Sequence, residues 1–229
     1  MCVRNNEKSI KTTFSKLIAL EKKHVNIHFR YHIFENDSID NTRTYIMNFI
    51  ENRDANIALR QYRNNQWDNI KSIKRVEDMC IYRNNMKNLC TSWDNSDFSI
   101  ILDTDIEFDN DILDEMMLIL YLYNNIAMVT PYGLVSGKNI YYDTFALDLN
   151  CFGHPLHTLQ KLAANVNNNT LIQLKSGFSG FIMIRSSVLQ HCNWGVSNYM
   201  CSEHNFFCSN VRKYGNIVCA TQIRVNWVK

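Results

Sequence analysis

The chain has 229 residues, of which 46% are hydrophobic and 20% charged, and its formal net charge at pH 7 is +2. This length and composition predict one globular domain, and the balanced charge excludes a general polyanion binder, which would concentrate basic residues on one face. No apolar run approaches a membrane span and no signal-like segment opens the chain, so we expect a soluble, cytoplasmic protein. The eight cysteines form no Cys-x-x-Cys pair, which favours reduced thiols over disulfides or a zinc site.

The hydrophobic pattern alternates between helical and strand-like segments along most of the chain. In the first half of the chain it predicts an apolar piece before Arg4, a helix ending near Lys23, a strand over 25–34, a helix over 42–52, a short strand over 56–59 and a helix over 68–89. A strand ending at Asp103, a helix over 112–120 and a strand over 127–130 closed by Pro131 to Gly133 follow. The last part is predicted to hold a strand over 141–147, a loop over 165–170, a strand over 181–184, a helix over 201–208 and a strand over 223–228. This order predicts an α/β fold with a largely parallel sheet.

Two acids, Asp103 and Asp105, directly follow the apolar run 98–102. Ligands of open α/β sheets gather at the carboxyl ends of such strands, and two carboxylates there can hold a divalent metal that a phosphate-bearing substrate shares. Asp is also common after strands as a turn or helix-capping residue. The next helix has its own expected cap in Asp109 or Asn110, which favours a ligand-binding role for the earlier pair.

The order of several motifs resembles the GT-A nucleotide-sugar glycosyltransferases over almost the whole chain. These motifs are a strand running into the polar turn 35–42, a helix with Arg83-Asn84, the strand into Asp103-Thr104-Asp105, the glycine-led strand 177–184, and Glu203-His204. The resemblance looks closest to the compact glycosyltransferases of large DNA viruses and to fungal capsule-associated mannosyltransferases. A viral source would place the protein in the host cytoplasm or the virion.

The resemblance implies a single GT-A (Rossmann-like) domain with a central, mainly parallel mixed sheet flanked by helices. Residues 1–130 would form the nucleotide-binding half and residues 131–229 the acceptor-binding half. The implied reaction is metal-dependent transfer of a sugar, expected to be a hexose, from a nucleoside-diphosphate sugar to a hydroxyl of a glycan or glycoprotein. Neither nucleic acid nor a membrane span is expected as part of this function.

A divalent cation is implied because the departing nucleoside diphosphate builds negative charge, which Mn²⁺ or Mg²⁺ neutralises. Asp105 is implied as the direct ligand, Asp103 as a contact to the ribose or to a metal-bound water, and His204 as a further ligand. The residues implied to contact the nucleotide donor are Arg4, Asn5, Glu35, Asn36, Asp37, Arg83, Asp103 and Thr104.

The acceptor hydroxyl needs a general base in an inverting reaction, and Glu203 is the first candidate. Glu203 is also an ordinary type of residue for the first turn of a helix. Asp143 is the second candidate, and it could instead bind the acceptor sugar or end a strand. Arg83 is either a phosphate-binding residue or a solvated helix arginine, and we expect Trp194 in the core rather than on a sugar ring.

Two rival functions remain open from the sequence. Haloacid-dehalogenase phosphatases also carry an Asp-x-Asp after an apolar strand, but there the motif opens the chain, whereas here it lies in the middle. The non-enzymatic alternative is a catalytically degenerate GT-A-like module that binds a glycan or a partner without turnover.

Overall fold

The computed structural model describes residues 1–62, 72–90, 96–138, 140–149, 170–196 and 202–228. Its helices and strands in chain order are β1 (Cys2–Val3), α1 (Glu7–Lys23), β2 (Tyr31–Asn36), α2 (Thr42–Ile50), β3 (Ala55–Arg60), α3 (Ile73–Lys87), β4 (Phe98–Leu102), β5 (Ile106–Phe108), α4 (Ile112–Leu122), β6 (Ile126–Val135), β7 (Asp148–Leu149), β8 (Leu171–Ser176), β9 (Phe181–Arg185), α6 (Ser186–Leu189), α7 (Glu203–Val211) and β10 (Asn216–Trp227).

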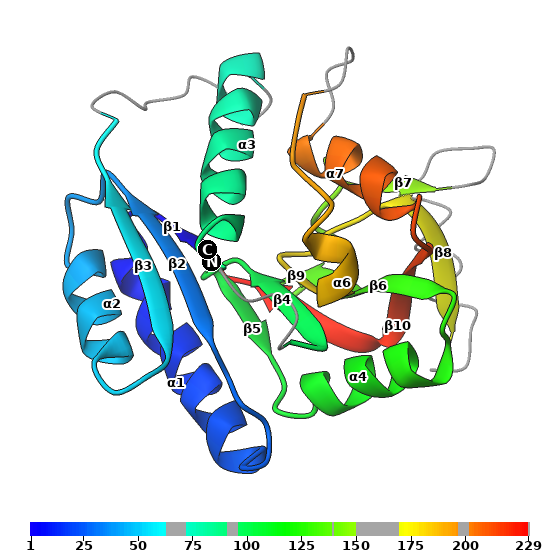
Figure 1. Cartoon of the computed structure of the whole chain (residues 1–229), viewed down its shortest axis with the longest axis horizontal. Coiled ribbons are helices and arrows are strands. Elements are labelled where there is room, and N and C mark those ends of the chain that lie inside the picture. The colour runs from blue at the N-terminus through cyan, green and yellow to red at the C-terminus, as the bar shows by residue number, and fades with distance from the viewer. Residues whose placement is uncertain (63–71, 91–95, 139, 150–169, 197–201, 229) are drawn as a thin grey trace.

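The described strands form two sheets (Figure 1). One is a parallel sheet of three strands in the order β1-β2-β3. The other has seven strands in the order β4-β9-β6-β10-β8-β7, with β5 paired to β10. Because β9 runs antiparallel to both β4 and β6, and β10 runs parallel to β6, the strands β4, β6 and β10 all point the same way. The predicted mixed α/β sheet is confirmed, with its parallel strands divided between two sheets.

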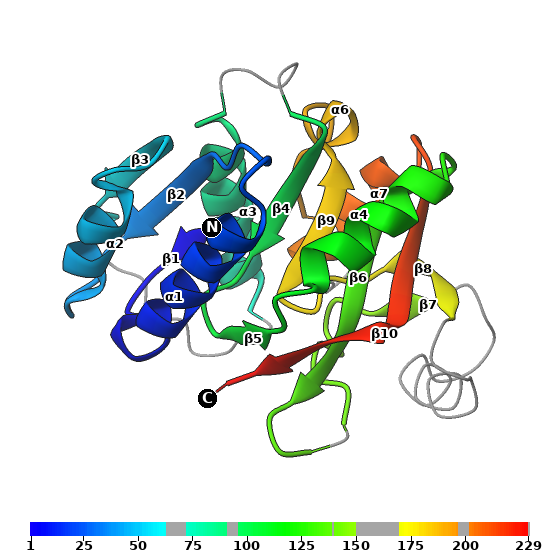
Figure 2. The ribbon, with the colours of Figure 1, turned by 90° about the horizontal axis from the view of Figure 1, so that it is seen from below.

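Helices cover both sheets and join them. Figure 1 shows α1 and α2 beside the three-stranded sheet and α3 standing between β1 and α7. Contacts of α1 with both α2 and β5, and of α3 with both β2 and α7, tie the two sheets together. Seen from below in Figure 2, β4, β9, β6 and β10 follow one another across the seven-stranded sheet, and α4 packs on β6 and β9.

Two hydrophobic cores lie on opposite faces of the strands, and each takes residues from both sheets. Phe34 and Ile101 belong to one core, whereas their chain neighbours Ile33 and Leu102 belong to the other. This alternation follows from the strand geometry, in which successive side chains point to opposite faces. Trp194 is 3% exposed and belongs to the first core, as predicted.

Five predicted segments differ in the structure. β10 begins at Asn216, seven residues before the strand predicted over 223–228. β2 begins only at Tyr31, so the residues from 25 to 30 are not part of the strand. β6 continues through Pro131, because this proline lies beside a register shift between β6 and β10 where the regular ladder is interrupted. The segment 141–147 is not a strand, and only Tyr141 forms an isolated bridge. At the start of α4 the cap position belongs to Asp111, not to the two residues before it.

Some expectations fall on residues outside the described ranges: the start of the helix over 68–89, most of the loop over 165–170, and the first residue of the helix over 201–208. The six cysteines within those ranges are free thiols. Among the described residues, none of the helices combines the length and the apolar character needed to cross a bilayer.

Candidate active site

The acidic turn after β4 is held at both ends by other strands. The amide of Asp103 donates to the carbonyl of Gly180 at 2.8 Å, and the carbonyl of Asp105 accepts from the amide of Val228 at 2.8 Å. Gly180 has a φ of +70°, and a Cβ on it would lie 2.4 Å from Cγ1 of Ile106. Only glycine therefore fits at this position, which lets the backbone before β9 approach the turn closely.

Arg83 of α3 lies buried between two carboxylates. Its Nε is 3.3 Å from Oε1 of Glu203, and its Nη2 is 3.4 Å from Oδ1 of Asp103. Its guanidinium also lies 4.8 Å from the ring centroid of Phe178. Burial opposes the charge, yet the two carboxylates raise the pKa of Arg83. Because its exposed fraction is 3%, the solvated-arginine interpretation is wrong.

Four acids lie near Arg83. Burial raises the pKa of Asp103 to about 6, against the opposing effect of Arg83. Three further carboxylates add to that rise: Asp105, Glu203 and Asp143. Burial also raises the pKa of Asp143 to about 6 and that of Asp105 in the same direction. We call these four acids the acidic cluster, and their perturbed ionisation is typical of a functional site.

Glu203 and His204 begin α7, where the side chain of the N-cap residue Ser202 accepts from the amide of His204 at 3.0 Å. The imidazole stacks on Phe178 with ring centroids 3.9 Å apart, and its Nε2 lies 3.3 Å from Oε1 of Glu203. Burial lowers the pKa of His204 to about 3, so the ring is neutral at neutral pH. Burial opposes ionisation of Glu203, but the ion pair with Arg83 lowers its pKa.

Two aromatic residues border the acidic cluster. The indole Nε1 of Trp227 donates to Oδ2 of Asp105 at 2.7 Å, and the Trp227 ring stacks on Tyr142 with centroids 5.4 Å apart. Next to Tyr142, Oδ2 of Asp143 accepts from the amide of Ser179 at 2.8 Å. Neither aromatic residue could be recognised from the sequence, because nothing in the residues around an aromatic side chain shows that it contacts an acid far away in the chain.

The turn after β2, which the resemblance implies as a nucleotide contact, is stabilised by hydrogen bonds among its own polar groups. Glu35 is fully buried, and its carboxylate accepts from the amide of Ser38 at 2.8 Å and from Nε of Arg43 at 2.6 Å. Oδ1 of Asn5 accepts from the amide of Ile39 at 2.9 Å. The side chains of Glu35 and Asn5 therefore stabilise the turn itself.

The other implied nucleotide contacts are also placed by the structure. Oδ1 of Asp37 accepts from the amide of Tyr62 at 2.8 Å, and the Asn36 side chain donates to Oδ2 of Asp37 at 3.3 Å. Arg4 and Asp37 both lie near enough to Tyr82 for their charges to act on its pKa, which burial raises to about 12. Thr104 lies apart from these residues in the turn after β4, where its carbonyl accepts from the hydroxyl of Thr13 at 2.9 Å.

The implied metal ligands are only partly brought together. Among the described residues, no three His, Cys, Asp or Glu side chains are arranged to hold a metal ion. His204 faces Glu203 and Phe178 instead of completing such a set with the two aspartates. Asp103 and Asp105 still fit a hard divalent cation, because their oxygens are the ligands it prefers and a cation would relieve their mutual repulsion.

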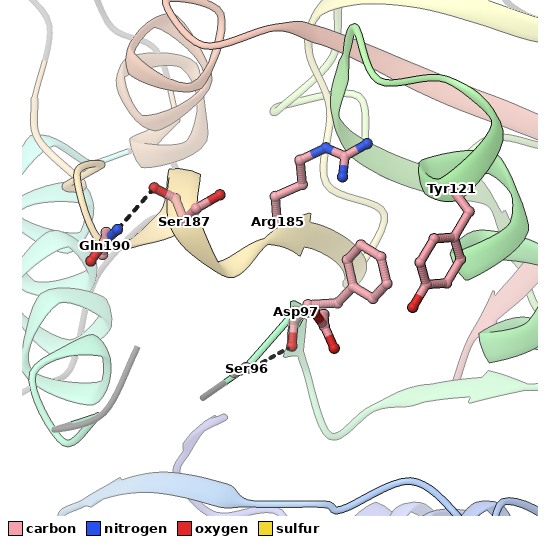
Figure 3. A pocket seen from close by; sticks show the side chains of 7 residues that line it. Ser96, Asp97, Tyr121, Arg185, Ser187 and Gln190 are labelled. Atoms are coloured by element: carbon pink, nitrogen blue, oxygen red, sulfur yellow. Dashed lines mark hydrogen bonds between the residues drawn. The ribbon is translucent and has the colours of Figure 1, made fainter. Parts of the chain in front are cut away.

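A cavity of about 390 Å³ lies elsewhere in the molecule, at the start of β4 and the end of β9 (Figure 3). Figure 3 shows Arg185 extending from β9 toward the helix that carries Tyr121, where it donates to the carbonyl of Ile126 at 3.0 Å and to that of Leu120. The five residues of β4, spanning about 17 Å, separate this cavity from Asp103. The cavity is therefore not part of the acidic site.

No family model matches the sequence, and no curated protein matches it either. Solved structures do match. TarS 1–349 of S. aureus is 11% identical with a TM-score of 0.63, and the match covers 99% of this chain and 58% of that one. Glucosyl-3-phosphoglycerate synthase from Mycobacterium tuberculosis in complex with phosphoglyceric acid is 11% identical with a TM-score of 0.52, covering 99% and 68%. GalNAc-T7 with UDP, GalNAc and Mn²⁺ is 11% identical with a TM-score of 0.53, covering 86% and 37%.

These neighbours are GT-A glycosyltransferases, and the likeness confirms that this chain has the GT-A fold. The same S. aureus protein has been solved with UDP-GlcNAc, at 14% identity and a TM-score of 0.59. The chain spans 58% of TarS 1–349 and 36% of the longer TarS structure. The viral and fungal resemblance stays a prediction.

Proposed function

We propose that this protein is a metal-dependent glycosyltransferase that transfers a hexose from a nucleoside-diphosphate sugar to a hydroxyl of a glycan or glycoprotein. The observation that carries the proposal is the acidic cluster around buried Arg83, on a GT-A fold. Two of its acids lie in the proposed nucleotide-binding half, residues 1–130, and two in the proposed acceptor-binding half, residues 131–229. Neighbours solved with UDP-GlcNAc, or with UDP and GalNAc, support a nucleotide-linked hexose as donor.

Asp105 and Asp103 would hold the cation, Mn²⁺ or Mg²⁺, which when bound offsets the charge that develops on the departing diphosphate. Arg83 favours the ionised forms of Asp103 and Glu203 against the effect of burial, because its guanidinium contacts both. We assign His204 to Glu203 rather than to the metal, since its Nε2 faces Oε1 of that residue. Arg4, Asn36 and Asp37 would contact the nucleotide at the end of β2, with Glu35 and Asn5 holding the turn, and Thr104 would contact it beside Asp103.

We propose Glu203 as the general base, with Asp143 as the competing candidate. The contacts of Glu203 with Arg83 and with His204 both fall on Oε1, and they hold its carboxylate in place at the start of α7. Asp143 is held by the amide of Ser179 and has a pKa raised to about 6, which also suits proton abstraction near neutral pH. The two assignments differ in pH dependence, because a base works only above its pKa.

The test is release of nucleotide from a panel of nucleoside-diphosphate hexoses with Mn²⁺. Asp105→Asn should lower the rate by about 100-fold or more, since several kcal/mol of charge stabilisation is lost. Asp97→Asn, an exposed change at the other end of β4, is the matched control and should leave the rate unchanged. Because Asp103 also has a pKa of about 6, the acidic limb of the pH–rate profile is compared between variants. A fall in rate below pH 6 that Asp103→Asn keeps and Asp143→Asn loses would assign the base to Asp143; a fall that Asp143→Asn keeps, with turnover abolished by Glu203→Gln, would assign it to Glu203.

Folded protein that releases no nucleotide from any donor, with or without Mn²⁺, would overturn the proposal. That outcome would favour the alternative of a degenerate GT-A-like module. Binding of a glycan array by the same inactive protein would then support the alternative directly.

A further inference from the structure

Trp227 lies near the end of β10, where the strand pairs on both sides. It is opposite Ile106 of β5 and opposite Val135 of β6. Its own carbonyl accepts from the amide of Ser136 at 3.1 Å, and the amide of the next residue, Val228, donates to the carbonyl of Asp105. The backbone of Trp227 is therefore fixed against the segment that carries Asp105.

The indole ring is fixed as well. It stacks on Tyr142 with an interplanar angle of 5°, and the amide of Tyr142 donates to the carbonyl of Gly133 at 3.1 Å, which ties that ring to β6. The indole has a single hydrogen-bond donor and no acceptor, and this N–H donates to Oδ2 of Asp105 at 2.7 Å. One specific oxygen of the carboxylate is thereby bound by a group that cannot turn away.

We propose that Trp227 is a positioning residue for the metal-binding carboxylate: its indole N–H holds Oδ2 of Asp105, so that Oδ1 is presented to the cation and the donor diphosphate. This inference rests on the proposed function. A carboxylate without such a partner can rotate about its terminal torsion and exchange its oxygens, whereas hydrogen bonds to a ligating carboxylate fix its orientation. The strand pairing of β10 and the stack on Tyr142 make the donor preorganised.

The experiment measures the dissociation constant of Mn²⁺, without donor, by the loss of the free Mn²⁺ EPR signal. Trp227→Phe keeps an aromatic ring to stack on Tyr142 but removes the N–H, and it should weaken Mn²⁺ binding by about 10-fold. Trp194→Phe is the matched control, because the same change at a core residue stacked on Phe207 removes no contact to the acidic cluster. Asp105→Asn should abolish the binding. Thermal unfolding verifies that each variant is folded.

Asp105-dependent Mn²⁺ binding that is equally tight in Trp227→Phe would overturn the inference, and so would the absence of Asp105-dependent binding in the parent protein. Weaker Mn²⁺ binding in Trp227→Phe, together with no turnover of any nucleotide sugar by the parent protein, would support this inference and contradict the proposed function.

A second measurement does not depend on the folding of Trp227→Phe. The indole ¹H–¹⁵N resonance of Trp227 in the parent protein should shift on addition of Mg²⁺, while that of Trp194 stays in place. A Trp227 resonance that does not respond to saturating Mg²⁺ would contradict the proposed contact.

Discussion

The turn after β2 and the turn after β4 both place acids at the carboxyl end of a buried strand, yet they treat those acids differently. In the first turn, the Glu35 carboxylate accepts from the amide of Ser38 and from the guanidinium of Arg43, and these nearby groups compensate its charge. In the second, Asp103 shares Arg83 with Glu203 and lies near two further acids. Polar groups that are all paired stabilise a turn, whereas several partly buried carboxylates with raised pKa values are typical of a functional site.

The strongest way to break this contrast is to remove the guanidinium that two of the acids share. Arg83→Met takes this contact away from the buried Glu203 and the half-buried Asp103, and it should lower the free energy of unfolding by about 3–5 kcal/mol. Urea denaturation measures this change. Lys74→Met removes an exposed lysine from its ion pair with the buried Asp78 on the same helix, and we expect a smaller effect. Equal stability of Arg83→Met and the parent protein would show that the cluster does not depend on Arg83.

A paired substitution sharpens the contrast between the turns. Glu35→Gln replaces one carboxylate oxygen with an amide NH₂ group, which would face a hydrogen-bond donor, either the Ser38 amide or the Arg43 guanidinium. It should lower the free energy of unfolding by about 1–3 kcal/mol. The folded protein should keep its turnover number. Asp103→Asn should instead lower activity without lowering stability. The raised pKa of Asp103 means that its ionised form is disfavoured in the folded state, so the neutral isostere should unfold at the same or a higher temperature and lose activity. Destabilisation by both substitutions would remove the distinction.

A further test of the contrast is the pH dependence of stability. The pKa values of Asp103 and Asp143 are raised to about 6 in the folded state from 3.8, so between these values the folded chain binds more protons than the unfolded one. Their contribution to the free energy of unfolding therefore falls as pH rises from about 4 to 6 and stays low above 6. The melting temperature of the double variant Asp103→Asn/Asp143→Asn, relative to the parent, should be higher at pH 7.5 than at pH 4. No change in this difference with pH would contradict the raised pKa values.

Local patterns in the sequence predicted the parts of the fold that depend on near neighbours. The helix over 7–23, β4 with its acidic turn, and the helix that begins at Glu203 all follow from periodicity and strand composition. β5 and β7 were missed because strands of two or three residues carry little periodicity. β8 was also missed, although buried residues occupy alternate positions along it. The strand predicted over 141–147 was wrong because aromatic residues favour strands only where a partner strand is present.

The candidate site was predicted in its list of acids but not in its arrangement. Asp103, Asp105, Asp143 and Glu203 could all be selected from the sequence, and the structure brings them together. Their partners could not be assigned from the sequence: Arg83 was selected as a donor contact but lies 120 residues from Glu203, and Trp227 lies 122 residues from Asp105. His204 was assigned to the metal from its type and position, and its contacts with Phe178 and Glu203 only became visible once the fold was formed.

The sequence by itself determined where strands end, which side chains there are acidic, and the order of motifs that resembles the GT-A glycosyltransferases. Only the tertiary structure decided the state of those acids. Ionisation depends on burial and on the charges within a few ångströms, and here both are set by α3, β9 and β10, which arrive at the acidic turn from distant parts of the chain. The turn after β2 could not be told from the turn after β4 by composition, because the difference lies in whether other segments bring partners for every charge.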